Sequence, residues 1–576
     1  MARSQLIAAA AASGATASRC ASGSASSSRR VLHSAVSSRR IAVVLTSLLA
    51  GYGAYQSYQF GDVGQLRSLT SLAKQGGIGL GMGFGLTAST TTTTTANAAP
   101  TRQILVIGAD DLSTGTFVGE GPISKMTSDN TRAVIEMLTP EQTDEKLRKM
   151  QESYYVNRGE GVVRYDLVQM PSNNPIEDDH SEKIVHVPGK SAESSTPKSD
   201  WMFWGSLIAT VARELNATYS ASPDFSPAPE DIDQAIKNGF LRLDDEIVNK
   251  SVEKVLDQTS KTVAAEVLAP ALSGSCALLS FYDSRSNLLR VACTGDSRAV
   301  LGRRNSKGLW SATALSSDQT GSNPDEEARL RRLHPNEPRV IHAGRVLGGL
   351  EPTRAFGDAS YKWTADTIRR LKTKFFARSA SPLSRTPPYV TAEPVVTTTK
   401  IQPEKGDFMV MATDGLWEML TNEEVVGLVG KWIDANGPPA PGAATASGKS
   451  LWKIAFGGAE TKLPLDTSAA ASAADGSKTP IRMAQWGMDP NHARFVVVDN
   501  NVATHLLRNA LGGRNADQVS ALLTLPAPFS RRYRDDLTIQ VVFFGESPSG
   551  KNHSGGVVLN YDASNMQLTE APKPKL

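Results

Sequence analysis

The sequence contains little cysteine, with only Cys20, Cys276 and Cys293 among 576 residues. So few thiols cannot cross-link a chain of this length, which excludes a disulfide framework as the basis of the fold. Cys276 and Cys293 stand in apolar runs, so we expect small buried thiols at these positions rather than nucleophiles.

The sequence also lacks the ligand spacing of a zinc site and an excess of positive charge. Its eight histidines form no HxxxH pattern, and there is no CxxC. The formal net charge is +3, but six arginines precede the first acidic residue, Asp62. Without them, 55 basic residues stand against 58 acidic residues, a net charge of −3. The chain after these arginines therefore has no excess of positive charge that could attract nucleic acid, and we expect no nucleic-acid partner.

The first hundred residues read as targeting and linker sequence. Residues 1–40 hold the six arginines, many serines and alanines and no acid, a composition typical of a mitochondrial presequence or of a disordered basic tail. Residues 41–60 are uncharged and apolar mainly over 41–55, shorter than the ~20 residues of a spanning helix, so a membrane anchor here stays an open alternative. The Gly- and Thr-rich residues 61–100 are predicted to be a linker.

The remaining chain has the composition of an ordinary globular protein, with 40% hydrophobic and 21% charged residues overall. We predict an N-terminal extension at 101–160, a main domain at 161–546 and a C-terminal tail at 547–576. Residues 437–480 are rich in Ala, Gly, Pro and Ser and are predicted to be a surface insertion. Apolar residues at helical spacing over 231–258 alternate with many short strand-like runs, which predicts an α+β fold of sheets covered by helices.

Several acidic residues fall where predicted strands begin or end. Asp414 follows FMVMAT, Asp296 follows VACTG, Asp535 precedes DLTIQVVFF, and Glu177 and Asp178 follow a turn limited by proline. Taken singly, each fits a turn or a helix cap. Taken together, carboxylates delivered to one point repel one another unless cations neutralise them. Oxygen ligands without Cys or His favour magnesium or manganese.

Seven motifs occur in a fixed order: PIEDDH (175–180), SGSCALL (273–279), TGDSRAVL (294–301), LSSDQTGSNPDEEARL (315–330), LGGLEPTRAFGD (347–358), MATDGLWEML (411–420) and YRDDLTIQVVFF (533–544). Over about residues 160–546 this series resembles the metal-dependent protein phosphatases, the protein phosphatase 2C family. PIEDDH and NVATHLLRNALGG (501–513) look like the mitochondrial pyruvate dehydrogenase phosphatase branch of fungal type.

The resemblance implies a β-sandwich of two antiparallel sheets flanked by helices, with two magnesium or manganese ions at one end of the sandwich. By motif, Asp414 and Asp535 match direct metal ligands. Asp178 matches a residue that faces the metals through water, with Glu177 beside it. Asp296 matches the position linked to a third, weaker ion.

Other motif residues carry weaker expectations. His180 matches the family's general acid for the leaving group, with a solvated loop histidine as the alternative. Asn173 stands where the family commonly has an arginine that grips phosphate. Arg354 and Asp358 are expected in a buried ion pair or turn, and Trp417 in the core.

One expected acid is missing. The run WMFWG (201–205) predicts a strand and SLIATVARELN (206–216) a helix, yet the family carries a DGHGG-type motif between such elements, whose aspartate bridges both metals. Asp200 cannot replace that aspartate, because WMFW would hold it more than ~10 Å away at the other end of the strand. We therefore hypothesise an in-frame loss at Gly205-Ser206.

Two functions follow from this sequence. The first is a mitochondrial, magnesium- or manganese-dependent serine/threonine phosphatase that hydrolyses phosphoproteins with metal-activated water; the resemblance suggests the pyruvate dehydrogenase complex as substrate. The second is a catalytically inactive binding or regulatory protein with the phosphatase fold, because the bridging aspartate is absent.

Overall fold

The computed structural model describes residues 3–10, 102–104, 124–126, 132–156, 160–186, 206–256, 260–375, 379–437, 463–466, 494–527, 529–546 and 557–565. These residues belong to one compact unit, Met1–Ala15 together with Ala98–Leu576. The predicted anchor at 41–60 and linker at 61–100 lie outside the described residues, as do most of the predicted presequence and insertion. Within the described ranges, no helix is both long and apolar enough to cross a membrane.

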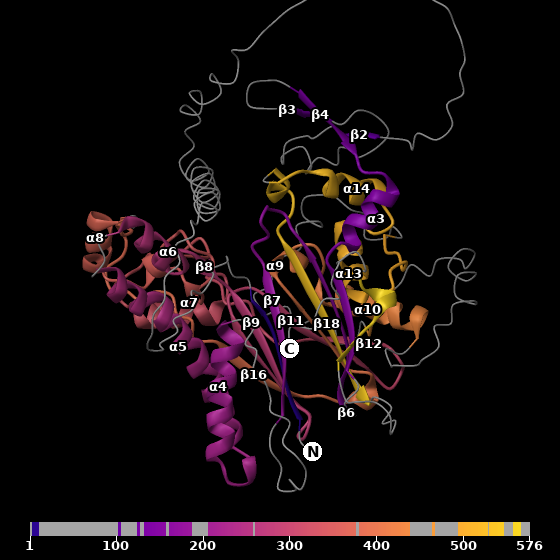
Figure 1. The fold of residues 1–576 in the computed structure, drawn as a ribbon, viewed down its shortest axis with the longest axis horizontal. Helices are drawn as coiled ribbons and strands as arrows, with labels where there is room; N and C mark the ends of the chain where they lie inside the picture. The colour runs from indigo at the N-terminus through magenta and orange to yellow at the C-terminus, as the bar shows by residue number, and fades with distance from the viewer. Residues whose placement is uncertain are drawn as a thin grey trace, which may run out of the picture. The chain divides into compact units, whose positions relative to one another are not determined.

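Two antiparallel sheets form the centre of the domain (Figure 1). The first has the order β16-β10-β9-β1-β7, formed by Val395–Lys400, Leu288–Thr294, Ala277–Asp283, Arg3–Ala10 and Asp179–His186. The second has the order β12-β11-β17-β18-β6-β5-β19, formed by Trp310–Ala314, Arg298–Arg304, Phe408–Ala412, Leu537–Glu546, Glu160–Met170, Gln151–Val156 and Val557–Leu559. The predicted α+β sandwich is confirmed. Its second sheet also includes β5 and β19, which lie outside the predicted 161–546 range.

Strand β17 shows why the sequence forms two layers. Met409 and Met411 face the core between the two sheets, while Phe408, Val410 and Ala412 face a second core on the outer side. Because side chains alternate along a strand, a strand buried on both faces needs an unbroken apolar run, and FMVMA supplies it.

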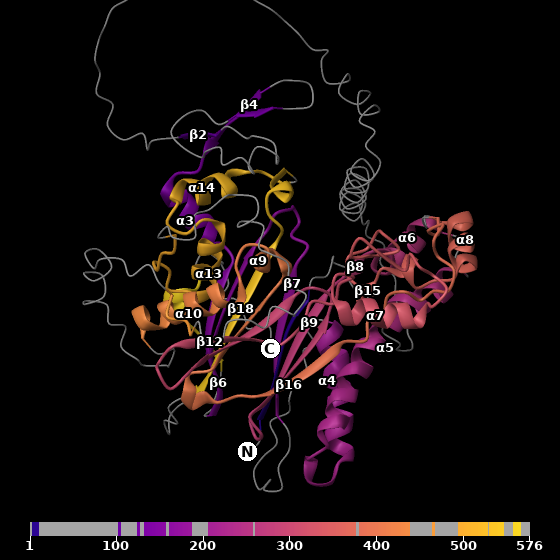
Figure 2. The ribbon, with the colours of Figure 1, turned by 180° about the vertical axis from the view of Figure 1, so that it is seen from behind.

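Helices cover the outer faces of the sandwich (Figures 1 and 2). On the five-stranded sheet lie α4 (Ser206–Ala221) and α5 (Pro229–Leu256), which confirms the helix predicted over 231–258. The seven-stranded sheet is covered by α9 (Asp414–Trp417), α10 (Asn422–Asn436) and α13 (Val502–Leu511). Beside α13 lie α3 (Pro140–Arg148) and α14 (Ala516–Thr524).

The smaller elements extend this frame. α6 (Lys261–Leu272) and α8 (Ala365–Lys374) share a core with α5. α7 (Pro324–Leu333) packs beside the ladder of β13 (Ile341–His342) and β14 (Arg345–Val346), and β8 (Gly274–Ser275) pairs with β15 (Phe356–Gly357). A three-stranded sheet lies within the predicted N-terminal extension (101–160). It is formed by β2 (Arg102–Ile104), β4 (Arg132–Met137) and β3 (Ser124–Met126), in that order.

Strand β1 occupies a central position that the sequence did not predict for it. Residues Arg3–Ala10 pair with β7 on one side and with β9 on the other. They belong to the predicted presequence. The predicted strand 201–205, directly before α4, lies outside the described residues.

Deleting residues 1–15 is expected to lower the melting temperature by several degrees, because two ladders of backbone hydrogen bonds are lost and two strand edges open. Circular dichroism melting of the full chain and the deletion, with removal of residues 566–576 as control, tests this. An unchanged melting temperature would show that the pairing of β1 with β7 and β9 contributes little to the stability of the sheet.

Candidate functional site

The predicted acidic residues lie at one edge of the seven-stranded sheet. The last residue of β17 pairs with the first residue of β11 and with the third residue of β18, and the first residue of β18 pairs with the last residue of β6. Asp414 follows β17, Asp296 precedes β11, and Asp535 precedes β18. Asp178 follows the turn after β6 and immediately precedes β7. The antiparallel register therefore brings these four residues to the same end of the sandwich.

Thr413 connects Asp178 to the start of α9. Its hydroxyl donates to Asp178 Oδ2 over 2.8 Å and accepts from the backbone N–H of Thr538 over 3.0 Å. The Thr413 N–H also donates to the Thr538 carbonyl over 3.1 Å. Since Thr413 directly precedes Asp414, these bonds hold the Asp178 carboxyl next to the Asp414 backbone. Apart from the threonine in MATDG, nothing in the sequence predicts this role.

The electrostatics confirm that the acids are close to one another. Burial raises the pKa of Asp178 to about 6; hydrogen bonds from Thr413 and Thr538 oppose the shift, while the charges of Asp536 and Asp414 add to it. Burial also raises the pKa of Asp296 above its ordinary value, and the charge of Asp414 is the next cause. The negative charge of Asp414 thus acts on the carboxyl groups of both Asp178 and Asp296.

Asp536 has a structural role that the sequence reasoning missed. Its buried carboxylate accepts the backbone N–H of Ser172 over 2.5 Å, the Ser172 hydroxyl over 2.7 Å and the N–H of Glu177 over 2.6 Å. These bonds fix the loop that carries Glu177 and Asp178. Gly415 is required nearby, because a Cβ at that position would lie 2.1 Å from the Asp536 carbonyl oxygen.

Glu177 and Asp535 lie at the exposed rim of this cluster. Glu177 accepts from the amide of Asn173 over 2.8 Å, and its other oxygen lies 3.7 Å from the Arg531 guanidinium. Arg531 also forms an ion pair with Asp535. Asp296, on the other side of the cluster, accepts from the Cys276 thiol over 3.2 Å. Glu418 ends α9, where its N–H donates to the Asp414 carbonyl over 2.8 Å.

His180 is not a solvated loop histidine, and that alternative is wrong. It is the second residue of β7 and is buried, with 6% of its surface exposed. Its Nδ1 lies 3.1 Å from Glu182 Oε1, which accepts from Gln540 Nε2 over 2.8 Å. Strand alternation puts His180 and Glu182 on the same face of β7, and His180 follows Asp178 by two residues in the chain.

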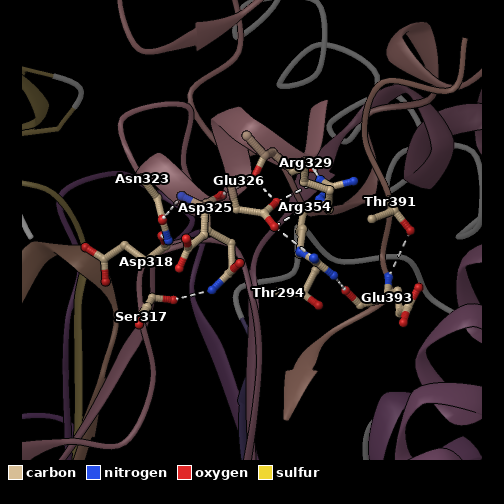
Figure 3. Close-up of polar contacts among 12 residues, drawn as sticks. Thr294, Ser317, Asp318, Asn323, Asp325, Glu326, Arg329, Arg354, Thr391 and Glu393 are labelled. Atoms are coloured by element: carbon tan, nitrogen blue, oxygen red, sulfur yellow. Dashed lines mark hydrogen bonds and ion pairs between the residues drawn. The ribbon is translucent and has the colours of Figure 1, made fainter. Parts of the chain in front are cut away.

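The motifs around Arg354 form a buried ion-pair network, as expected (Figure 3). The Glu326 carboxylate, on α7, accepts from Arg354 over 2.8 Å, from Arg329 over 2.9 and 2.7 Å, and from the Thr353 hydroxyl over 2.6 Å. Burial alone would raise the pKa of Glu326, but the hydrogen bonds of Arg329 and Arg354 outweigh it and lower the pKa to about 2. Arg354 also donates to the Glu393 carbonyl over 2.6 Å, which ties α7 to the segment before β16.

Arg354→Met is expected to destabilise the protein by about 3–5 kcal/mol, because it leaves the buried Glu326 without one of its two guanidinium partners. Arg331→Met is the matched control, since the Arg331–Glu327 pair is exposed and worth ~0.3–0.5 kcal/mol. Urea unfolding of both variants gives the comparison. Equal losses would show that the network contributes no more than a surface pair.

The other expectations for non-catalytic motif residues also agree with the structure. Asp358 lies in a left-handed turn, with φ 44°, at the start of a short 3-10 helix (Ala359–Tyr361). Trp417 is buried, with 4% of its surface exposed. Cys293 is buried, and burial raises the pKa of its thiol well above the ordinary value, which disfavours a thiolate nucleophile. Cys276, which was also expected to be buried, is only partly buried, because its thiol lies beside the acid cluster and donates to Asp296.

The cluster fits a hard cation in its chemistry, but the described residues supply only part of a ligand set. Its donors are carboxylate oxygens, which magnesium and manganese prefer, and the raised pKa values show that a positive charge would relieve the site. However, in the part of the chain that the structure describes, no three His, Cys, Asp or Glu side chains are grouped so that they could hold a metal ion. The junction Gly205-Ser206, where the bridging aspartate was expected, lies beside residues outside this description.

Comparisons with known proteins agree with this geometry. Residues 181–450 match the family described as Protein phosphatase 2C. The chain is 42% identical over 481 residues to the mitochondrial pyruvate dehydrogenase (acetyl-transferring)-phosphatase 1 of Saccharomyces cerevisiae, covering 78% of this chain and 80% of the relative. It is 39% identical over 420 residues to a protein phosphatase 2C homolog of Schizosaccharomyces pombe, covering 70% and 84%.

Similarity extends to mammals. The mitochondrial pyruvate dehydrogenase (acetyl-transferring)-phosphatase 1 of Rattus norvegicus is 35% identical over 363 residues, covering 60% of this chain and 59% of the relative. Members of the family generally depend on magnesium or manganese. On the identity, coverage and order of motifs, the chain belongs to the protein phosphatase 2C family, in the branch that contains these pyruvate dehydrogenase phosphatases.

Proposed function

We propose that this protein is a mitochondrial serine/threonine phosphatase that removes phosphate from the pyruvate dehydrogenase complex. The observation that carries the proposal is the 42% identity, over 80% of its length, to the yeast enzyme named for that activity. The convergence of Asp178, Asp296, Asp414 and Asp535 at one end of the sandwich supports it, because the reaction needs an anionic site that gathers cations.

Asp414 and Asp535 are proposed as direct ligands of two magnesium or manganese ions, with Glu177 and Asp178 contacting them through water. Asp296 is proposed for a third, weaker ion. When bound, such ions lower the pKa of a water molecule and neutralise phosphoryl oxygens during in-line attack. No single motif can supply this site, because the proposed ligands come from the ends of four strands, β7, β10, β17 and β18.

The chain's own residues prepare the remaining steps. Thr413 orients the Asp178 carboxyl through its 2.8 Å hydrogen bond, and Asp536 holds the loop that carries Glu177. His180 is proposed to protonate the leaving serine or threonine oxygen. Its 3.1 Å contact with Glu182 fixes the orientation of the ring, which a general acid requires.

Import into mitochondria is supported by the relatives' location and by the arginine-rich, acid-free residues 1–40. Anchoring in a membrane through residues 41–60 remains a separate proposal, and it rests only on the apolar composition of that segment.

The absence of a DGHGG-type motif after Gly205 is the one observation that favours an inactive binding protein. The comparisons do not favour that alternative, because the relatives are named as phosphatases. Purified full-length chain incubated with a phosphoserine peptide and manganese decides between the two functions. Release of inorganic phosphate that a chelator stops supports the enzyme; no release with any divalent cation supports the binding protein.

A further inference from the structure

Arg531 presents a guanidinium at the rim of the acid cluster on a backbone that is firmly attached. It lies in a short 3-10 helix, η6 (Phe529–Arg532). The neighbouring Ser530 is buried and its hydroxyl donates to the Ser172 carbonyl over 2.5 Å. Arg534 donates to the Pro171 carbonyl over 2.7 Å. These bonds fix η6 against the start of the loop that carries Asn173, Glu177 and Asp178.

Arg531 forms two ion pairs at the solvent-exposed rim. One partner, Asp535, is 23% exposed; the Arg531 side chain is 40% exposed, and its other partner, Glu177, is 53% exposed. Ion pairs with this much exposure add little to stability, because water screens both charges. A guanidinium held among carboxylates on an exposed rim is instead available to an anion that enters from solvent.

Asn173 and Arg531 lie on two sides of the same carboxylate. The Asn173 amide donates to Glu177 Oε1 over 2.8 Å, and Arg531 Nη2 lies 3.7 Å from Glu177 Oε2. Asn173 is neutral, so of the two side chains that contact Glu177 here only Arg531 carries a positive charge, and it comes from a segment more than 350 residues away in the chain.

An anionic substrate needs such a charge. A phosphoryl group with about two negative charges is repelled by the carboxylates of the cluster, and a guanidinium offers two parallel N–H donors that match two phosphate oxygens. We propose that Arg531 binds the phosphoryl group of the substrate, releasing Glu177 as it does so. This inference rests on the proposed phosphatase function and assigns a substrate-binding residue to it.

Binding of inorganic phosphate to the full-length chain, measured by calorimetry with manganese present, tests the proposal without requiring turnover. Arg531→Met is expected to weaken phosphate binding about 10- to 100-fold, the range for a charged hydrogen-bonding partner. Arg531→Lys keeps the positive charge but loses the two parallel N–H donors of the guanidinium, so an intermediate loss of phosphate affinity is expected. Arg369→Met is the matched control, since Arg369 is 72% exposed on α8 and should leave binding unchanged.

The double variant Asn173→Arg/Arg531→Met supplies a rescue. A guanidinium placed on the other side of Glu177 is expected to recover at least part of the lost phosphate affinity. With the peptide assay, KM should follow the same order as the phosphate affinities in all four variants.

The outcomes separate this inference from the proposed function. Phosphate binding that is unchanged in Arg531→Met, with tighter manganese binding, would overturn the inference and make Arg531 only a counter-charge for Asp535. Arg531-dependent phosphate binding without peptide hydrolysis would keep the inference and overturn the enzyme. A wild-type chain that neither binds phosphate nor hydrolyses peptide would overturn both.

Discussion

Asp414→Asn is expected to reduce phosphatase activity by at least about 10³-fold, which corresponds to ~4 kcal/mol of transition-state stabilisation. Asp414 is the first residue of α9 and is separated from the fully buried strand β17 only by Thr413, so its carboxyl has a rigid support in the acid cluster. Asparagine keeps the shape but removes the negative charge that a divalent cation requires. The proposed site therefore loses a direct ligand without losing its fold.

The same substitution is expected to stabilise the metal-free protein at high pH. The pKa of Asp178 is raised from 3.8 to about 6, so the folded state holds this proton more tightly than the unfolded state does. A raised carboxyl pKa contributes stability that is full below about pH 4 and is lost as the pH rises through 6. The charge of Asp414 contributes to this shift and to that of Asp296. Removing it should add on the order of 1 kcal/mol at pH 8 and almost nothing at pH 4.

Two measurements on the same protein check this result. Urea unfolding with chelator at pH 4 and pH 8 gives the stability change, and phosphate release with manganese gives the activity. Asp366→Asn, at an exposed position 64% accessible on α8, is the control and should change neither. An Asp414→Asn protein that keeps wild-type activity would remove Asp414 from the metal site. A loss of stability at pH 8 would show that Asp414 has a structural partner instead.

Much of this site could be predicted because strand ends are visible in the sequence. Apolar runs such as FMVMA and TIQVVFF identify strands buried on both faces, and the acids beside them mark the edge at which those strands meet. The helix α5 was equally clear, since Ile232, Ile236 and Phe240 recur at helical spacing and are all buried. In both cases the signal lies within one short segment of the sequence, an unbroken apolar run for the strands and helical spacing for α5.

Contacts between distant segments could not be predicted in this way. Asp536 and Asp535 are adjacent acids before one strand, yet Asp536 points inward to the loop of Ser172 and only Asp535 reaches the rim. Alternation along a strand predicts that they face opposite ways, but not which faces the site. His180 was ambiguous for the same reason, because its environment depends on Gln540 of the opposite sheet through Glu182.

Nothing in the sequence predicts that β1 is a central strand of the sheet. Arg3–Ala10 carries an arginine and an alanine-rich end, which is typical of a presequence rather than of a central strand. The register with β7 and β9 comes from backbone hydrogen bonds, and backbone pairing leaves little trace in composition. The strand predicted at 201–205 was inferred from its apolar side chains, and these remain outside the described residues.

Inserting Asp-Gly-His-Gly-Gly between Gly205 and Ser206 is expected to raise manganese-dependent turnover by about 10²- to 10⁴-fold. The described acids come from the ends of β7, β10, β17 and β18, and none of them forms a group of three that could hold a metal ion within the described chain. A further carboxylate at the start of α4 would join these donors and position two ions against the substrate, and positioning of this kind accounts for factors of that size.

The inserted aspartate also has a predictable effect on binding. Without it, the two proposed ions share too few ligands, so the second ion should bind this chain too weakly for calorimetry to resolve more than about one equivalent of manganese. With it, calorimetry should detect a second equivalent, and manganese should raise the melting temperature further, because a ligand that binds only the folded state stabilises it by mass action. Tighter binding and faster turnover should appear together.

The matched control is the same insertion with asparagine in place of its aspartate, which lengthens the junction equally but adds no charge. If both insertions raise turnover alike, the gain comes from relief of a shortened connection before α4 and not from a bridging ligand. If neither does, while Asp414→Asn still abolishes activity, the chain already has a complete site, and the bridging-ligand hypothesis is wrong.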